Sequence, residues 1–285
     1  MGKLDLNQQT GVIIYAIQAF KRIRNTAMLA ILSPAKNLDF SPSMLQPSVT
    51  MPSFPEDTNA LITAARKMSR KKIRELMKLS ENLAELNYQR YQSFDTDAGE
   101  HGVKPAILAF KGDTYIGLDA NSLTENDLAF AQDHVAILSG LYGLLRPFDG
   151  IQPYRLEMGT KLATKRGKNL YEFWGDSITE AVNDTKTNAV VNLASKEYFS
   201  AIKPALLNCQ IITPVFKEIK DGKARTLGMF AKRARGMMAR HIVLNRLDEP
   251  EGLKAFTDGG YKFMPELSNE NHWEFHRDQP PAVVK

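Results

Sequence analysis

Residues 28–36 read Met-Leu-Ala-Ile-Leu-Ser-Pro-Ala-Lys, a short apolar run that ends in a polar turn. Such a run has the length of a fully buried β-strand. From this point onward, compact apolar runs alternate with segments of helical periodicity, which is the pattern of domains whose helices cover a sheet. The stretch therefore predicts an α/β fold, with a mixed sheet and surrounding helices.

The remaining elements follow from the same periodicities. Strands are expected over residues 29–32, 106–110, 188–193 and 273–275, and a hairpin is expected where Asp221-Gly222 separates residues 211–218 from 223–229. Helices are expected over residues 57–68, 70–92 and 230–247, with Ser69 as the N-cap of the second. A capping box over residues 124–127 predicts a further helix that runs to about Leu138.

Length and composition predict a single domain. The chain has 285 residues, of which 43% are hydrophobic, and no stretch has the roughly 18 consecutive apolar residues of a membrane helix. No linker divides residues 28–285, whereas residues 1–27 read as a dispensable N-terminal extension. Cys209 is the only cysteine, so a reducing cytoplasm is the expected location. The oligomeric state is open, with a monomer favoured.

The positive charge is concentrated in two segments. The net charge is only +5, but residues 66–78 carry seven Lys or Arg against Glu75, a net +6. Residues 217–246 carry nine Lys or Arg against two acids, a net +7. Two concentrated basic segments are typical of a surface that binds a polyanion, although two ordinary solvated helix faces would give the same count.

Residues 138–147 predict a glycine-rich turn after a helix. Gly140 and Gly143 are separated by apolar residues, and Arg146 lies just beyond. A helix-hairpin-helix element uses such a turn to bring backbone N–H groups close to a DNA phosphate. A helix C-cap followed by a tight turn would explain the glycines equally well.

The expected helix over residues 230–247 is amphipathic. Its predicted apolar face holds Phe230, Ala234, Met237, His241 and Leu244, and its predicted basic ridge holds Lys232, Arg233, Arg235, Arg240 and Arg246. No acid interrupts the ridge from Lys232 to Arg246. Guanidinium groups suit phosphate, so this ridge is the stronger DNA-binding candidate.

Polar residues also gather where strands are expected to end. Ligands in α/β sheets bind beyond the carboxyl ends of strands, so these residues could line one pocket. The candidate pocket residues are Ser33, Lys36, Lys111, Asp113, Tyr154, Arg155, Trp174, Asn192, Ser195 and Tyr198. Turns and helix caps use the same residue types, and that alternative stays open.

No metal or cofactor site is predicted. His272 and His276 are four residues apart, which in a strand separates them by roughly 13 Å. His101, His134 and His241 are isolated, and no HExxH, CxxC or P-loop motif is present.

Seven ordered motifs give the chain a family resemblance. They cover residues 28–36, 106–113, 138–147, 152–159, 171–176, 192–198 and 231–236. Together they resemble the YaaA family of bacterial peroxide-stress proteins, with similarity from Met28 to about Arg277. Residues 66–78 belong to none of these motifs.

The resemblance implies a cytoplasmic protein that limits damage by unincorporated iron. It further implies an unusual single-domain α/β fold that binds double-stranded or distorted DNA through a positively charged cleft with a helix-hairpin-helix element. Carried over to this chain, the hairpin is Gly140–Gly143 with Arg146, and the basic ridge is Lys232, Arg233 and Arg235. The resemblance assigns no catalytic residue.

Two hypotheses follow from the sequence. The first is a DNA-binding stress protein that uses the basic ridge, including Arg240, and the glycine turn. The second is an enzyme that acts on a nucleotide, a nucleic-acid base or another small anion. The enzyme hypothesis requires five residues to converge on one cleft, namely Lys36, Lys111, Asp113, Ser195 and Tyr154.

Overall fold

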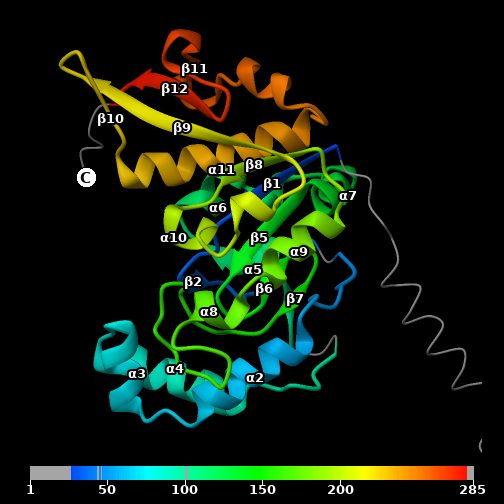
Figure 1. The fold of residues 1–285 in the computed structure, drawn as a ribbon, viewed down its shortest axis with the longest axis vertical. Helices are drawn as coiled ribbons and strands as arrows, with labels where there is room; N and C mark the ends of the chain where they lie inside the picture. Colours follow the sequence, from blue (N-terminus) through cyan, green and yellow to red (C-terminus); the bar gives the residue numbers. More distant parts are fainter. Residues whose placement is uncertain (1–26, 44, 46, 100–101, 281–285) are drawn as a thin grey trace, which may run out of the picture.

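The computed structural model describes residues 27–280 except for 44, 46, 100 and 101. The predicted extension over residues 1–27 lies almost wholly outside the described residues. Eight strands form one mixed sheet in the order β11-β12-β9-β8-β1-β5-β6, with β10 paired to β9 (Figure 1). Helices surround this sheet, so the predicted α/β class is confirmed.

Five parallel strands form the centre of the sheet. They are β12 (His272–Asp278), β9 (Gln210–Lys220), β8 (Ala189–Leu193), β1 (Met28–Leu32) and β5 (Val135–Ser139). The antiparallel edges are β6 (Gly143–Leu145), β10 (Lys223–Arg225) and β11 (Lys262–Phe263). All five residues of β1 are buried, as its apolar composition requires for a strand at the centre of a parallel sheet.

Short strands and helices complete the fold. The strands are β2 (Asn37–Leu38), β3 (Lys104–Pro105), β4 (Phe110–Lys111) and β7 (Gly150–Ile151). The first helices are α2 (Pro55–Arg66), α3 (Arg70–Met77), α4 (Glu81–Ser93), α5 (Ala106–Ala109) and α6 (Asp113–Leu118). The later helices are α7 (Glu125–His134), α8 (Leu170–Trp174), α9 (Ser177–Asp184), α10 (Lys196–Phe199) and α11 (Gly228–Leu244).

Several predicted elements are confirmed close to their expected bounds. These are the strands β1, β8 and β12, the helices α2 and α11, and the β9–β10 hairpin. The hairpin turns at Asp221 and Gly222, whose φ angles of 52° and 70° suit this two-residue connection. Ser69 caps α3 by accepting a hydrogen bond from the N–H of Lys72.

Three element predictions are wrong. Residues 106–109 form a buried helical turn instead of a strand, because a four-residue apolar run carries no periodicity that separates the two. The helix over residues 70–92 is broken at Lys78, which adopts a left-handed conformation before Ser80 caps α4. Helix α7 ends at His134, and Val135 begins a strand that pairs with β1.

The capping box of α7 is present as predicted and ties the helix to the rest of the fold. The Asp127 carboxylate accepts hydrogen bonds from the N–H and hydroxyl of Thr124, and Arg246 donates to it over 2.7 Å. These hydrogen bonds, those from Thr124 first, lower the pKa of Asp127 to about 2.

We expect Asp127→Ala to lower the free energy of unfolding by about 1–2 kcal/mol at neutral pH, because the cap and the Arg246 pair are both lost. A carboxylate whose pKa is lowered on folding stabilises the native state at pH values above its unfolded pKa of about 3.9. This stability is lost as the pH falls toward 2. The difference between wild type and variant in urea denaturation should therefore shrink over that window. Glu125→Ala, in the same turn but exposed, is the matched control and should change little.

Candidate functional site

A cavity lies where β1 and β8 end side by side. Their register pairs Leu32 with Leu193, so the residues that follow leave the sheet together. From here β1 is followed in the sheet by β5 on one side, whereas β8 is followed by β9 on the other. Such a divergence is the topological switch point at which open α/β sheets bind ligands.

Two serines join the strand ends. Ser33 follows β1, and its Oγ accepts a hydrogen bond of 2.8 Å from the N–H of Ser195, beyond β8. The two hydroxyl oxygens are 3.4 Å apart. Tyr115 donates from its hydroxyl to the carbonyl of Ser33 over 3.0 Å, which attaches α6 to the same point. These hydrogen bonds therefore connect the ends of β1 and β8 to each other and to α6.

The cavity has a volume of about 370 Å³. Six of the ten predicted pocket residues line it, namely Ser33, Lys36, Lys111, Asp113, Ser195 and Tyr198. Two residues predicted to contact DNA, Lys232 and Arg235, line it as well. The carboxylates of Glu157 and Glu197 complete its charged groups. Four of the five residues that the enzyme hypothesis requires, Lys36, Lys111, Asp113 and Ser195, thus line one cavity, and α11 contributes to the same space.

Four predicted pocket residues lie elsewhere, which corrects that part of the prediction. Tyr154 is buried and shares a 2.7 Å hydrogen bond with Ser139. Trp174 is buried and donates from its indole N–H to the carbonyl of Gly140 over 3.1 Å. Both aromatic rings fill the core, and each satisfies its own polar group with a hydrogen bond there.

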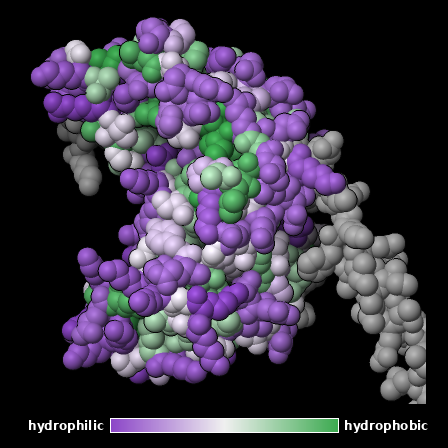
Figure 2. Space-filling model, in the orientation of Figure 1, coloured by the Kyte–Doolittle hydropathy of each residue, from purple (hydrophilic) through white to green (hydrophobic). Residues whose placement is uncertain are grey.

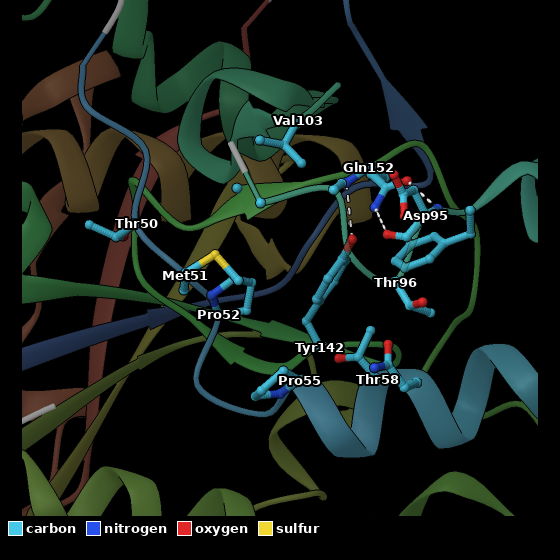
Figure 3. A pocket seen from close by; sticks show the side chains of 15 residues that line it. Thr50, Met51, Pro52, Pro55, Thr58, Asp95, Thr96, Val103, Tyr142 and Gln152 are labelled. Carbon is cyan, nitrogen blue, oxygen red and sulfur yellow. Dashed lines mark hydrogen bonds between the residues drawn. The ribbon is translucent and has the colours of Figure 1, made fainter. Parts of the chain in front are cut away.

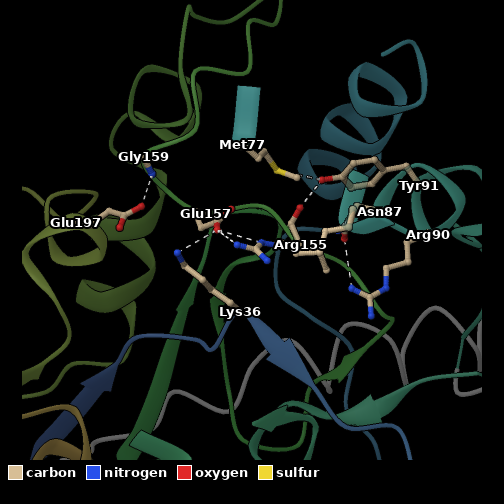
Figure 4. A network of polar contacts seen from close by, with 10 residues as sticks. Lys36, Met77, Asn87, Arg90, Tyr91, Arg155, Glu157, Gly159 and Glu197 are labelled. Atoms are coloured by element: carbon tan, nitrogen blue, oxygen red, sulfur yellow. Dashed lines mark hydrogen bonds and ion pairs between the residues drawn. The ribbon is translucent and has the colours of Figure 1, made fainter. Parts of the chain in front are cut away.

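Asn192 and Arg155 lie beside the cavity without lining it. Asn192 opens onto a neighbouring cavity and donates to Thr213 over 3.3 Å. Arg155 donates to Glu157 from Nε and Nη2, over 3.1 and 2.9 Å (Figure 4). Arg155 is therefore a partner of a cavity residue.

Glu157 organises one wall of the cavity. Its Oε1 atom accepts from Arg155 and lies 3.6 Å from Nζ of Lys36, whereas its Oε2 atom is buried without a hydrogen-bond partner (Figure 4). Burial raises the pKa of the neighbouring Tyr198 well above its ordinary value, so this phenol stays neutral. The wall therefore offers carboxylate acceptors and a hydroxyl donor side by side.

Sequence reasoning missed Glu197, Thr114 and Tyr115 in this lining. Glu197 lies inside the motif over residues 192–198, two positions after Ser195, and this position could have identified it as a pocket residue. Thr114 and Tyr115 line the cavity because α6 begins directly after Gly112. The apolar periodicity of the sequence does not predict so short a helix.

The glycine turn is not a helix-hairpin-helix element. Gly140–Gly143 joins two antiparallel strands, and both glycines are buried. The N–H groups of Leu141 and Tyr142 donate to Oγ of Ser139 and so do not face a phosphate. The prediction is wrong because pairing of residues 135–139 with β1 overrides continuation of the helix.

Arg146 is also engaged inside the fold. It donates from Nε and Nη2 to Oδ1 of the fully buried Asp149, over 3.0 and 2.8 Å. Arg240 donates to the carbonyls of Leu118 and Asp119 at the end of α6. Of the predicted DNA-binding residues, Lys232 and Arg233 are exposed and Arg235 is half-buried.

The apolar face of α11 is rotated from the prediction. Of the five residues expected there, Ala234 alone is fully buried, and Leu244 is 47% exposed. The buried residues instead include Ala231, Met238 and Ile242. The reason is that α11 packs against both α6 and the sheet, which buries a wider arc than one stripe.

The two basic segments lie on the same side of the molecule. Helices α3 and α4 form one end and α11 with the β9–β10 hairpin forms the other, on the left in Figure 1. The surface is hollowed between them (Figure 2). The α3–α4 end adjoins the cavity wall, because Tyr91 of α4 donates to the carbonyl of Arg155 (Figure 4). We call this hollow with its two basic margins the basic cleft.

Part of the charge at these margins is already paired. On α3, Arg70 pairs with Glu85 and Arg74 pairs with Glu81. Among the described residues, the two basic segments hold the following exposed cations without an ion-pair partner: Lys67, Lys71, Lys72 and Lys78 in residues 66–78, and Lys220, Lys223, Arg225, Lys232 and Arg233 in residues 217–246.

A separate cavity of about 60 Å³ lies beside α2 (Figure 3). Its polar groups are paired with one another, since the N–H of Gln152 donates to the hydroxyl of Tyr142 and the side chain of Gln152 bonds the backbone of Asp95. It is small, and the one charged residue in its lining, Asp95, uses its carboxylate to accept a hydrogen bond from the N–H of Asp97, so we do not assign it as the site.

Two classes of site are absent from the described residues. Within residues 27–280, apart from the four undescribed positions, three or more His, Cys, Asp or Glu side chains nowhere gather as metal ligands would. In the same part of the chain, every helix is too short or too polar to cross a bilayer.

Comparison with known proteins shows the family. The family model described as "Peroxide stress protein YaaA" matches residues 28–267. A protein of Saccharophagus degradans named "UPF0246 protein" is 49% identical over 256 residues, which cover 88% of this chain and 100% of the relative. A protein of the same name from Paraburkholderia phytofirmans is 50% identical over 256 residues, covering 88% and 98%. The chain therefore belongs to the YaaA family of peroxide stress proteins.

Proposed function

We propose that this peroxide stress protein binds double-stranded or distorted DNA in the basic cleft. The carrying observation is that residues of two basic segments, about 150 positions apart in the sequence, border one hollow of the surface. Concentrated Lys and Arg on one face bind phosphate through release of counterions.

The same counterion release offers a route to protection from iron. Cations condensed on DNA are displaced when protein side chains neutralise its phosphates. Ferrous ions held at the phosphates would leave with them, and peroxide would then generate radicals further from the bases. We propose that the protein acts in the cytoplasm as a monomer. In this way it would limit iron-dependent damage without binding iron itself.

We expect Lys232→Ala/Arg233→Ala and Lys71→Ala/Lys72→Ala each to weaken duplex binding about tenfold at about 50 mM salt, because each pair removes two phosphate contacts. The slope of log affinity against log salt should fall by about 2 in each variant. Fluorescence anisotropy with labelled duplex and bubble DNA measures both quantities. Lys262→Ala, an exposed lysine on the edge strand β11, is the control.

Because the two margins of the cleft are tested separately, the binding data distinguish three outcomes. Loss of affinity in both double variants, with an unchanged Lys262→Ala, supports the cleft. Equal affinity of all four proteins would refute it. Loss in the α11 variant alone would restrict the interface to one margin and remove α3 from the proposal.

A second candidate function is an enzyme that acts on a nucleotide, a nucleic-acid base or another small anion. It is favoured by the convergence of six predicted strand-end residues with Lys232 and Arg235 on one cavity at the switch point. The volume of about 370 Å³ is within the range of small-molecule sites.

A further inference from the structure

Arg235 is a half-buried cation without a hydrogen-bond or ion-pair partner among the described residues. No carboxylate or carbonyl among the described residues accepts a hydrogen bond from it, although Arg240 on the same helix and Arg246 just beyond its end are both paired. Burying a guanidinium without compensation is costly, because an arginine does not lose its proton. Such a group is best tolerated where an anion binds to it and compensates its charge.

Arg235 also stands between two cavities. Of the described residues, it alone lines both the cavity at the switch point and a neighbouring cavity of about 960 Å³. The segment after β8 forms the ridge between them, since Leu193, Ser195 and Glu197 line the first cavity whereas Asn192, Ala194 and Lys196 line the second. An anionic group on Arg235 would therefore have room on either side.

The first cavity supplies a complementary acceptor close to Arg235. Asp113 lines it, is half-buried, and has no hydrogen-bond or ion-pair partner among the described residues. It begins α6, whose Thr114 carbonyl lies against Gly236, the residue after Arg235. A free guanidinium and a free carboxylate thus face one space of about 370 Å³ without pairing with each other.

We propose that this cavity binds a ribonucleoside phosphate, with the phosphate on Arg235 and Lys232 and the ribose hydroxyls on Asp113. Guanidinium is the preferred partner of phosphate, and a carboxylate near a switch point suits ribose hydroxyls. The neutral hydroxyls of Ser33, Ser195 and Tyr198 supply further donors and acceptors. This proposal rests on the second candidate function and not on the DNA interface.

Calorimetric titration of the full-length protein with AMP, dAMP and adenosine tests the arrangement. Wild type should bind AMP about tenfold more tightly than either of the others, since each lacks one of the two recognised groups. Arg235→Gln should weaken AMP about tenfold or more and leave adenosine unchanged, with Arg235→Lys intermediate because it keeps the charge and loses the fork. Asp113→Asn should bring AMP and dAMP to similar affinity.

Arg233→Gln is the matched control, because Arg233 is exposed on the same helix and belongs to the proposed DNA surface. It should weaken duplex DNA and leave AMP unchanged, so failure of one proposal is visible separately from the other. Tighter binding of dAMP than AMP would transfer the site to a DNA nucleotide and overturn the ribonucleotide assignment. Absence of AMP binding to wild type, or equal binding by Arg235→Gln, would overturn it outright.

Folding of the variants is checked by their melting temperatures. Because Arg235 is an uncompensated half-buried charge, Arg235→Gln should melt at or above the wild-type temperature without ligand. AMP should raise the melting temperature of wild type but not of this variant. If Arg235→Gln failed to fold, the Arg235→Lys and Asp113→Asn titrations would still decide, since wild-type behaviour of both contradicts the proposal.

Discussion

Gly236→Ala is expected to lower the free energy of unfolding by about 2–3 kcal/mol, although alanine is the better helix former by about 1 kcal/mol. A Cβ atom at Gly236 would lie 1.8 Å from the carbonyl oxygen of Thr114 and 2.8 Å from the N–H nitrogen of Leu118. Both neighbours are backbone atoms of α6, so the two helices would have to separate. A Cβ atom at Gly117 would likewise lie 2.1 Å from the carbonyl oxygen of Arg233.

Gly228→Ala is the matched control for this prediction. It lies in the first turn of the same helix and its Cβ would meet nothing within 4 Å, so alanine there should be neutral or stabilising. Urea denaturation of both variants gives the comparison. Wild-type stability of Gly236→Ala would contradict the close crossing. The crossing also sets where Lys232 and Arg235 meet the cavity, so Gly236→Ala should weaken any ligand bound there.

Arg146→Ala is expected to lower the free energy of unfolding by about 3–5 kcal/mol, because it leaves the charge of Asp149 buried without its partner. Arg146 reaches this carboxylate through two guanidinium nitrogens and its own N–H, and Thr50 donates the remaining side-chain hydrogen bond over 2.6 Å. Affinity for DNA per folded molecule should stay unchanged, since the guanidinium is already engaged.

The pH dependence of Arg146→Ala has a definite sign. Burial raises the pKa of Asp149 even in the wild type, and removing Arg146 removes the group that lowers it most. A folded pKa above the unfolded value of about 3.9 means that the native state binds more protons in that window, so stability falls as the pH rises through it. The cost of Arg146→Ala should therefore be larger at pH 7 than at pH 4.

A double-mutant cycle with Asp149→Asn checks the cause. The double variant should be more stable than Arg146→Ala alone, because the neutral amide removes the buried charge. Additive losses would show that Arg146 stabilises through packing instead of through the pair.

Fold and site were predictable to different degrees. Strands β1 and β8 and helix α11 were readable because their apolar runs are long or sharply bounded. The residues 106–109 and 135–139 were misassigned because short apolar runs take their conformation from the neighbours with which they pair. Ser33, Lys36, Ser195 and Tyr198 were identified because the parallel strands β1 and β8 deliver their carboxyl ends to one edge, whereas Lys111 and Asp113 reach the cavity from β4 and α6.

The tertiary structure alone decided which cations are free. Arg146, Arg235 and Arg240 look equivalent in sequence, yet the first pairs with a buried aspartate and the third caps α6. Of the three, Arg235 lines a cavity and has no partner in the part of the chain that the structure describes. Charge and hydrophobic pattern are local properties, so the sequence by itself determined the α/β class, the family and the two basic segments. The partners of Arg240 are more than a hundred residues away in the sequence, and only the packing of α11 on α6 brings them into contact.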